Sequence, residues 1–216
     1  MRKADRIDII VSFLMESGVK MLLEELKKAM KRGAKVRILT GNYLGITQPS
    51  ALYLIKHELG ELVDLRFYNE KNRSFHPKSY IFHYADHSEI YIGSSNISRS
   101  ALTSGIEWNY RFSSHRDPEN YKKFYCTFED LFQNHSIVID DKELKRYSKT
   151  WHRPAASKDL DRYDNVEEEE DTKVRLLFEP RGAQIEALCA LENSRAEGAL
   201  RGIVQAATGV GKTYLA

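Results

Sequence analysis

Long apolar runs, cysteine and net charge are all scarce in this 216-residue sequence. The longest apolar stretch, Ile7 to Met15, is interrupted by Asp8 and Ser12 and is too short to span a bilayer. No secretion-signal pattern is found either. The composition is that of an ordinary globular protein, so we expect no membrane partner. With only two cysteines in the sequence, a reducing cytoplasm is the expected location.

The two cysteines, Cys126 and Cys189, fall on opposite sides of a predicted domain boundary, so a disulfide framework is not expected. The net charge of +2 identifies no partner by itself. Basic residues outnumber acidic ones in residues 1–150, and the reverse holds in residues 151–216. This distribution is compatible with a polyanionic partner of the first part, although solvated basic helix faces give the same excess.

Strand and helix patterns alternate over the first 150 residues. Six segments rich in β-branched and aromatic residues predict strands: 6–15, 35–40, 62–68, 78–84, 89–92 and 107–112. Helical spacing of apolar residues predicts helices over 19–30 and 117–132, with others beginning near Pro49 and just after Asn96. The order predicts an α/β fold with a mixed central sheet flanked by helices.

The predicted helix 117–132 carries a stripe of aromatic residues: Tyr121, Phe124, Tyr125, Phe128 and Phe132. Because the stripe repeats at helical spacing, it favours core packing over a platform for stacked bases.

The character of the chain changes after the first domain, which we assign to residues 1–150. Apolar residues become sparse, and Glu167 to Asp171 is acidic throughout. Residues 151–171 therefore read as a linker, and residues 172–216 as the start of a second domain.

The most informative chemical pattern begins with His76-Pro-Lys78. Residues two apart on a strand point to the same face, so an imidazole nucleophile and an ammonium group can meet one phosphate there. Lys78 can neutralise a phosphoryl oxygen without any metal ion.

Further polar residues follow within about thirty positions. Gly93-Ser94-Ser95-Asn96 supplies two hydroxyls and a carboxamide that can donate to phosphoryl oxygens. Glu107 can accept a hydrogen bond from an imidazole and fix its tautomer.

These residues resemble the phospholipase D superfamily, whose motif is His-x-Lys followed by Gly-Ser-x-Asn, and the resemblance covers most of residues 5–150. The general pattern has an Asp where this chain has His83, with Asp86 three residues later. The chain looks more like a subgroup in which the acidic partner follows the Asn, the position of Glu107. That subgroup includes a metal-independent restriction endonuclease and the amino-terminal domains of certain bacterial helicases.

The resemblance implies cleavage through a phosphohistidine, with a second histidine protonating the leaving oxygen. The chain holds one His-x-Lys, so the second histidine is expected to be His76 of another subunit in a two-fold homodimer. No cofactor is expected for the nuclease. A metal site formed by His83 and His87 is the alternative, and it is disfavoured because no thiolate lies nearby.

A second pattern lies near the end of the chain. Gly209-Val-Gly211-Lys212-Thr213 follows an apolar run that reads as a strand, the arrangement of a phosphate-binding loop. It resembles the loop of superfamily 2 helicases, in which Ala206 is common, and Gln184 resembles their adenine-reading glutamine. The resemblance implies ATP and Mg²⁺ as cofactors of a RecA-like motor. The sequence stops at Ala216, so we expect the motor to be incomplete here and not to hydrolyse ATP.

Together the patterns predict a metal-independent nuclease attached to a helicase of restriction or defence type, with DNA as the favoured partner and RNA as the second. The alternative function is a dimeric module that binds nucleic acid for the motor and cleaves nothing. A lipid hydrolase is disfavoured because no amphipathic apolar surface stands out.

Overall fold

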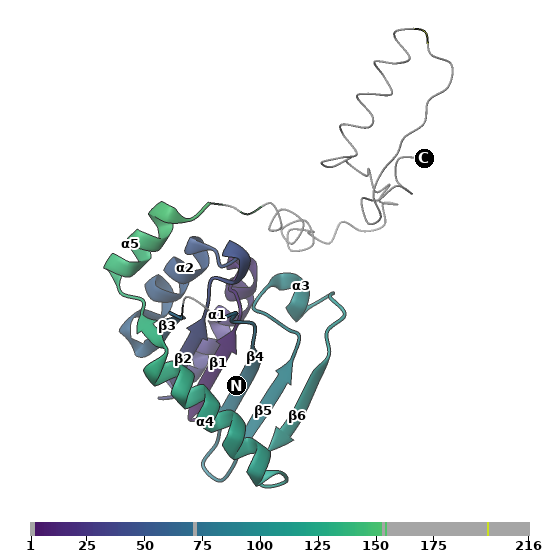
Figure 1. Ribbon diagram of the computed structural model, residues 1–216. Coiled ribbons are helices and arrows are strands. Elements are labelled where there is room, and N and C mark those ends of the chain that lie inside the picture. Colours follow the sequence, from purple (N-terminus) through teal and green to yellow (C-terminus); the bar gives the residue numbers. More distant parts are fainter. Residues whose placement is uncertain (1–2, 71–72, 153, 155–197, 199–216) are drawn as a thin grey trace, which may run out of the picture. The chain divides into compact units, whose positions relative to one another are not determined.

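The computed structural model describes residues 3–70, 73–152, 154 and 198. Residues 3–152 form an α/β domain around a mixed seven-stranded sheet with the strand order β6-β5-β4-β1-β2-β3-β7 (Figure 1). The predicted fold class is thereby confirmed. None of the helices in the described part of the chain has the length and apolar character needed to cross a membrane.

The sheet has a parallel centre and antiparallel flanks. β1, β2 and β3 run parallel, whereas β4, β5 and β6 alternate in direction on one side and β7 is antiparallel to β3 on the other. The strands are β1 (Arg6–Val11), β2 (Lys35–Thr40), β3 (Val63–Tyr68), β4 (Lys78–His83), β5 (Ser88–Gly93), β6 (Asn109–Ser113) and β7 (Ser136–Val138).

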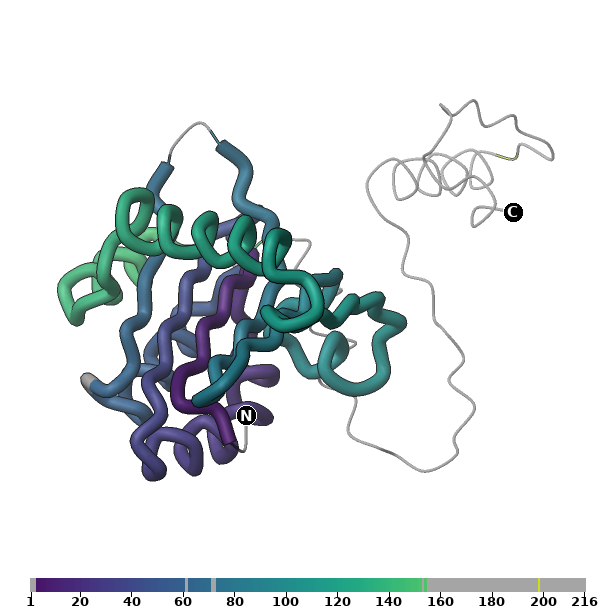
Figure 2. The backbone as a smooth tube through the Cα atoms, turned by 90° about the horizontal axis from the view of Figure 1, so that it is seen from below, coloured from purple at the N-terminus to yellow at the C-terminus, as the bar shows by residue number. Residues whose placement is uncertain are grey.

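Helices cover both faces of the sheet. The α-helices are α1 (Glu16–Lys31), α2 (Pro49–Leu59), α3 (Arg99–Leu102), α4 (Pro118–Asn134) and α5 (Asp141–Thr150), with short 3₁₀ turns at Tyr43–Gly45 and Gly60–Leu62. Figures 1 and 2 show α4 crossing one face, while α1 and α2 lie on the other. One apolar cluster joins β1 to α1, α2 and α5, and a second joins the sheet to α4.

The predicted strands and helices are confirmed with three differences. β1 ends at Val11 and not near Met15, because the N–H groups of Ser12 and Phe13 donate to Asn96 Oδ1 instead of continuing a strand ladder. β6 begins at Asn109, two residues later than expected. β7 and α5 have no counterpart among the predicted elements.

The prediction that the aromatic stripe of α4 packs in the core is right for only part of the stripe. Phe128 and Phe132 are buried in the second apolar cluster, as expected. Phe124 keeps 45% of its surface exposed, because it lies against Phe112 of the edge strand β6, where the sheet ends.

The ends of several strands lie together at one edge of the sheet, where His76 and Lys78 are also found. The carboxyl ends of β1, β2 and β3 meet the beginning of the antiparallel β4. A single row of paired residues crosses four strands there: Lys78, Val11, Thr40 and Phe67. Residues in such a row lie side by side, so loops that leave this edge come together.

A buried ion-pair network ties the sheet to α4. The Asp8 carboxylate, with no exposed surface, accepts two 2.7 Å bonds from Arg37 and lies 2.8 Å from His83 Nε2. Arg37 also contacts Glu129 of α4 at 2.6 Å. Burial raises the pKa of Asp8, but the hydrogen bonds from Arg37 and His83 outweigh it and hold the pKa below its ordinary value.

His83 belongs to this ion-pair network. It reaches back to Asp8 and to Ser88 Oγ, whereas His87 contacts Asp86 at the hairpin turn. The two histidines thus have separate partners. No group of three or more His, Cys, Asp or Glu in the described ranges is arranged to hold a metal ion.

We expect Arg37→Leu to lower the free energy of unfolding by about 3–5 kcal/mol, because it leaves a buried carboxylate without its main partner. Asp8→Leu with Arg37→Leu removes both charges and should recover part of the loss. Arg116→Leu, at an exposed arginine, should change stability by no more than about 0.5 kcal/mol. Urea denaturation measures all three variants. Equal losses for Arg37→Leu and Arg116→Leu would contradict the network's role.

Candidate active site

His76 and Lys78 lie together at the gathered edge of the sheet. Lys78 opens β4 and is buried, and its Nζ lies 2.8 Å from Nε2 and 3.0 Å from Nδ1 of His76. His76 itself precedes the strand, in a loop, where the Tyr43 ring lies 4.4 Å from its own. The imidazole and the ammonium group therefore meet, but the strand geometry predicted for the pair is wrong, because β4 begins at Lys78 and a loop places the imidazole.

The electrostatics of this pair favour a neutral imidazole. Burial and the neighbouring Lys78 cation both lower the pKa of His76 from its ordinary 6.5. Burial also lowers the pKa of Lys78, while the Glu107 carboxylate acts in the opposite direction. Near pH 7 His76 thus keeps an unprotonated ring nitrogen, the state in which imidazole is a nucleophile.

Asn96 is buried beside the end of β1. Its Oδ1 accepts from the backbone N–H groups of Ser12 at 3.1 Å and Phe13 at 3.4 Å. Its NH₂ group has no hydrogen-bond partner among the residues that the structure describes. The carboxamide is therefore oriented by its oxygen and retains its donors.

The two serines of the motif have different surroundings. Ser95 is buried, and its hydroxyl accepts from Asn109 Nδ2 at 2.8 Å while its carbonyl accepts from Tyr80 Oη at 2.9 Å. Ser94 is exposed, and its hydroxyl donates to the Glu107 carboxylate and accepts from the backbone N–H of Trp108. Ser95 is thus held in the framework, and Ser94 lies at the surface.

The contact made by Glu107 differs from the one suggested by the sequence. Glu107 was expected to accept from an imidazole, but its described hydrogen bond is with Ser94. Because Glu107 precedes β6 and Ser94 follows β5, their contact closes the end of the β5–β6 pair. Its charge still reaches Lys78 and offsets part of the lowering of that side chain's pKa by burial.

Two glycines allow the close approach of these segments. A Cβ on Gly93 would lie 2.0 Å from the Trp108 carbonyl oxygen, and one on Gly18 of α1 would lie 2.5 Å from the Ile97 carbonyl carbon. Both obstacles are backbone atoms that cannot turn aside. Small residues at both positions therefore bring the Gly93–Asn96 segment against β6 and α1.

Sequence reasoning missed the residues that support the site. Tyr80 is two positions beyond Lys78 on β4, and that spacing alone could have placed it on the same face. Tyr43 begins a short 3₁₀ turn, and Ser12 follows the end of β1. No periodic pattern marks either residue.

The predicted nucleotide-binding residues Gln184, Gly209, Gly211, Lys212 and Thr213 lie outside the described residues.

Comparison with known proteins agrees with this fold and motif. The family model "Cardiolipin synthase, PLD-like domain" matches residues 1–134, more than half of the sequence. The chain therefore belongs to this phospholipase D-like family. A second model, "Type III restriction enzyme, res subunit", matches residues 177–216, so the chain also carries a helicase-like fragment. A search of curated proteins returned no match.

Three solved structures share distant similarity. NucT from Helicobacter pylori is 15% identical, with 62% of this chain and 82% of that chain covered and a TM-score of 0.47. Polyphosphate kinase from Porphyromonas gingivalis is 12% identical, with 90% of this chain and 24% of that chain covered and a TM-score of 0.49. Phosphatidylserine synthase from Haemophilus influenzae Rd KW20 is 14% identical, with 76% of this chain and 42% of that chain covered and a TM-score of 0.47. The chain thus spans under half the length of the last two. All three TM-scores are below 0.5, so the family assignment rests on the family model.

We expect the pKa of His76, followed by NMR, to lie below 6.5 and to rise in Lys78→Met. The neighbouring cation is removed while burial persists, so the rise should stop short of 6.5. Lys31→Met, near the end of α1, serves as the control and should leave the titration unchanged. A wild-type pKa at or above 6.5 would contradict the electrostatic description.

Proposed function

We propose that residues 1–150 form a metal-independent phosphodiesterase that cleaves DNA, with RNA as the second candidate, through a phosphohistidine at His76. The observation that carries the proposal is the contact of Lys78 Nζ with the imidazole at 2.8 Å, with burial and charge keeping that imidazole neutral. A nucleophile and a cation for one phosphoryl group thus come from the protein itself.

The reaction proceeds in two displacements. A neutral ring nitrogen of His76 attacks phosphorus, the P–O bond to the leaving group breaks, and a second histidine gives its proton to the departing oxygen. Water then attacks the phosphohistidine, the second histidine takes up a proton, and the His76 nitrogen leaves. Lys78 and the NH₂ group of Asn96 donate to the phosphoryl oxygens as charge develops on them.

The second histidine comes from another copy of the chain. Of the chain's histidines, His76 alone belongs to a His-x-Lys motif, so a two-fold axis beside it would supply the acid. An apolar surface near the half-site supports this arrangement. Ile106, Trp108 and Tyr110 keep 94%, 83% and 69% of their surface exposed, beside the Ser94–Glu107 contact and on or next to edge strand β6.

The proposal extends to the whole protein. Residues 151–171 are a linker, and residues 172–216 begin a superfamily 2 motor that binds ATP and Mg²⁺ through Gln184, Gly209, Gly211, Lys212 and Thr213. The match to the res subunit of type III restriction enzymes supports this part and a role in restriction or defence.

The alternative function is a nucleic-acid-binding dimerisation module that cleaves nothing. It is favoured by one observation: the carboxylate of Glu107 is engaged by Ser94, so it does not fix an imidazole tautomer within a single copy.

We expect cleavage of labelled single- or double-stranded DNA to persist in excess EDTA and to disappear in His76→Ala, because both reacting groups belong to the protein. Lys78→Ala and Asn96→Ala should each lower the rate by about 10²-fold or more, since each loses a donor to the developing charge. Lys122→Ala, at an exposed lysine of α4, should cleave at the wild-type rate. Activity that requires Mg²⁺ would disprove the mechanism. Binding without cleavage would favour the alternative function, the binding module.

We expect a homodimer by light scattering at micromolar concentration, with a bell-shaped pH–rate profile from the two coupled imidazoles. Trp108→Asp should shift the protein towards monomer and lower activity, because it places a charge in the proposed interface. Leu62→Asp, at an equally exposed leucine outside that surface, should change neither property. A fully active wild-type monomer would rule out the shared site.

A further inference from the structure

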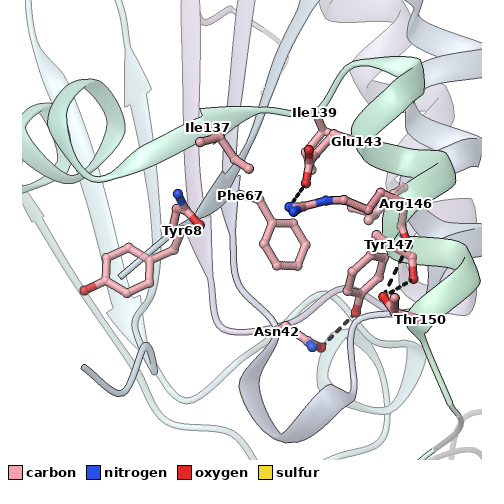
Figure 3. Close-up of a pocket in the computed structure, with 11 residues that line it drawn as sticks. Asn42, Phe67, Tyr68, Ile137, Ile139, Glu143, Arg146, Tyr147 and Thr150 are labelled. Atoms are coloured by element: carbon pink, nitrogen blue, oxygen red, sulfur yellow. Dashed lines mark hydrogen bonds and ion pairs between the residues drawn. The ribbon is translucent and has the colours of Figure 1, made fainter. Parts of the chain in front are cut away.

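A cavity of about 290 Å³ opens between β3, β7, α5 and the loop after β2 (Figure 3). Its wall is apolar and aromatic where Phe67, Ile139 and Tyr147 line it. Asn42, Asn69 and the ion pair of Arg146 with Glu143 add polar groups. Apolar walls with a few polar groups are the usual make-up of a small-ligand site.

The aromatic wall is held in place before any ligand arrives. Tyr147 Oη lies 2.8 Å from Asn42 Oδ1 and 2.7 Å from the Thr47 carbonyl oxygen, and its single proton is shared between these two acceptors. The rings of Phe67 and Tyr147 lie 5.1 Å apart at 50°. Figure 3 shows the Phe67 ring in the middle of the pocket, between the isoleucines of the β7 region and Tyr147. A flat ligand would therefore meet a fixed ring surface.

The polar groups suit a heterocycle that both donates and accepts hydrogen bonds. Asn42 and Asn69 are exposed, and the NH₂ group of Asn42 and the side-chain carboxamide of Asn69 have no protein hydrogen-bond partner within the described part of the chain, so both are open to solvent and to a ligand. A carboxamide presents a donor and an acceptor side by side, which matches the edge of a nucleobase. An acyl chain that covered these amides would displace their water without replacing its hydrogen bonds, which costs binding energy.

The cavity and the proposed nuclease site share one edge and one face of the sheet. Phe67 and Lys78 are the two ends of the cross-strand row, three strand spacings apart. At about 4.8 Å a spacing the separation is roughly 14 Å, which a short stretch of single strand can span. Tyr43 links the two places, because its ring contacts His76 and its neighbour Asn42 lines the cavity.

We propose that this cavity receives one unpaired nucleobase of the strand whose backbone is cleaved at His76. The inference rests on the proposed nuclease function and deepens it. The base stacks on Phe67, and the amides of Asn42 and Asn69 meet its edge. Arg146, which pairs with Glu143 through Nη2, has further N–H donors for the neighbouring phosphate. A paired base cannot enter, so the substrate is single-stranded or has an unpaired base near the cleaved bond.

The test measures fluorescence anisotropy of labelled single-stranded oligonucleotides on the full-chain His76→Ala protein, which binds without cutting. An abasic residue is moved along the strand one position at a time. We expect one position to weaken binding by about tenfold, the loss of one stacked base. Asn69→Ala should weaken binding of the intact strand several-fold and leave binding of that abasic strand unchanged.

Arg146→Ala and Lys145→Ala both remove one exposed positive charge from α5, and only Arg146 lines the cavity, where it pairs with Glu143. Arg146→Ala should weaken binding more than Lys145→Ala at equal salt. Equal effects of the two, together with an abasic scan that is flat at every position, would overturn the inference.

The outcomes separate the two proposals. A protein that neither binds nor cleaves any oligonucleotide would remove the nuclease function itself. Wild-type cleavage combined with a flat abasic scan would remove only the base pocket. Capture of phosphatidylglycerol vesicles that is lost in Asn69→Ala would show a lipid in the cavity and would also overturn the pocket.

Discussion

The bonds from the Ser12 and Phe13 N–H groups to Asn96 Oδ1 join the end of β1 to the segment that follows β5. They stop the strand, satisfy two buried donors and leave the NH₂ group of Asn96 for a ligand. The neighbouring contacts depend on the same seam. The backbone N–H of Met15 donates to the Ile97 carbonyl oxygen, and Gly18 lets α1 approach that backbone closely. A shift of this seam would move the proposed phosphate donors away from Lys78.

Electrostatics of opposite kinds operate at the two ends of the strands. In β1, the buried Asp8 is balanced by the Arg37 charge and contacts His83 Nε2, and these groups are almost wholly enclosed. At the other end, Lys78 faces an imidazole whose pKa its charge lowers. The first arrangement supports the fold because every charge has a partner. The second suits a reaction, because a cation beside a neutral imidazole has unused capacity for an anion.

Under the proposed function, one copy of the domain is incomplete as an enzyme and yet selects its substrate. In that proposal the half-site supplies the nucleophile, and the exposed apolar surface around Trp108 offers a place for a second copy. The cavity lies at the Phe67 end of the cross-strand row, beside β3 and β7, on the side of the sheet away from β6. A nucleic-acid strand bound at His76 would thus reach the cavity without crossing the proposed dimer interface.

The sequence by itself determined the α/β order, the strands and helices of the first 134 residues, and the meeting of His76 with Lys78, because periodicity and short motif spacing are local properties. It missed β7, which is three residues long, and α5, whose residues are mostly charged or polar, since neither carries a strong apolar pattern. Only the tertiary structure decided the pairing of Asp8 with Arg37, the engagement of Glu107 by Ser94, and the cavity between Phe67 and Tyr147. The Asp8–Arg37 and Phe67–Tyr147 contacts join residues 29 and 80 positions apart, and burial and strand register fix such contacts rather than any local pattern.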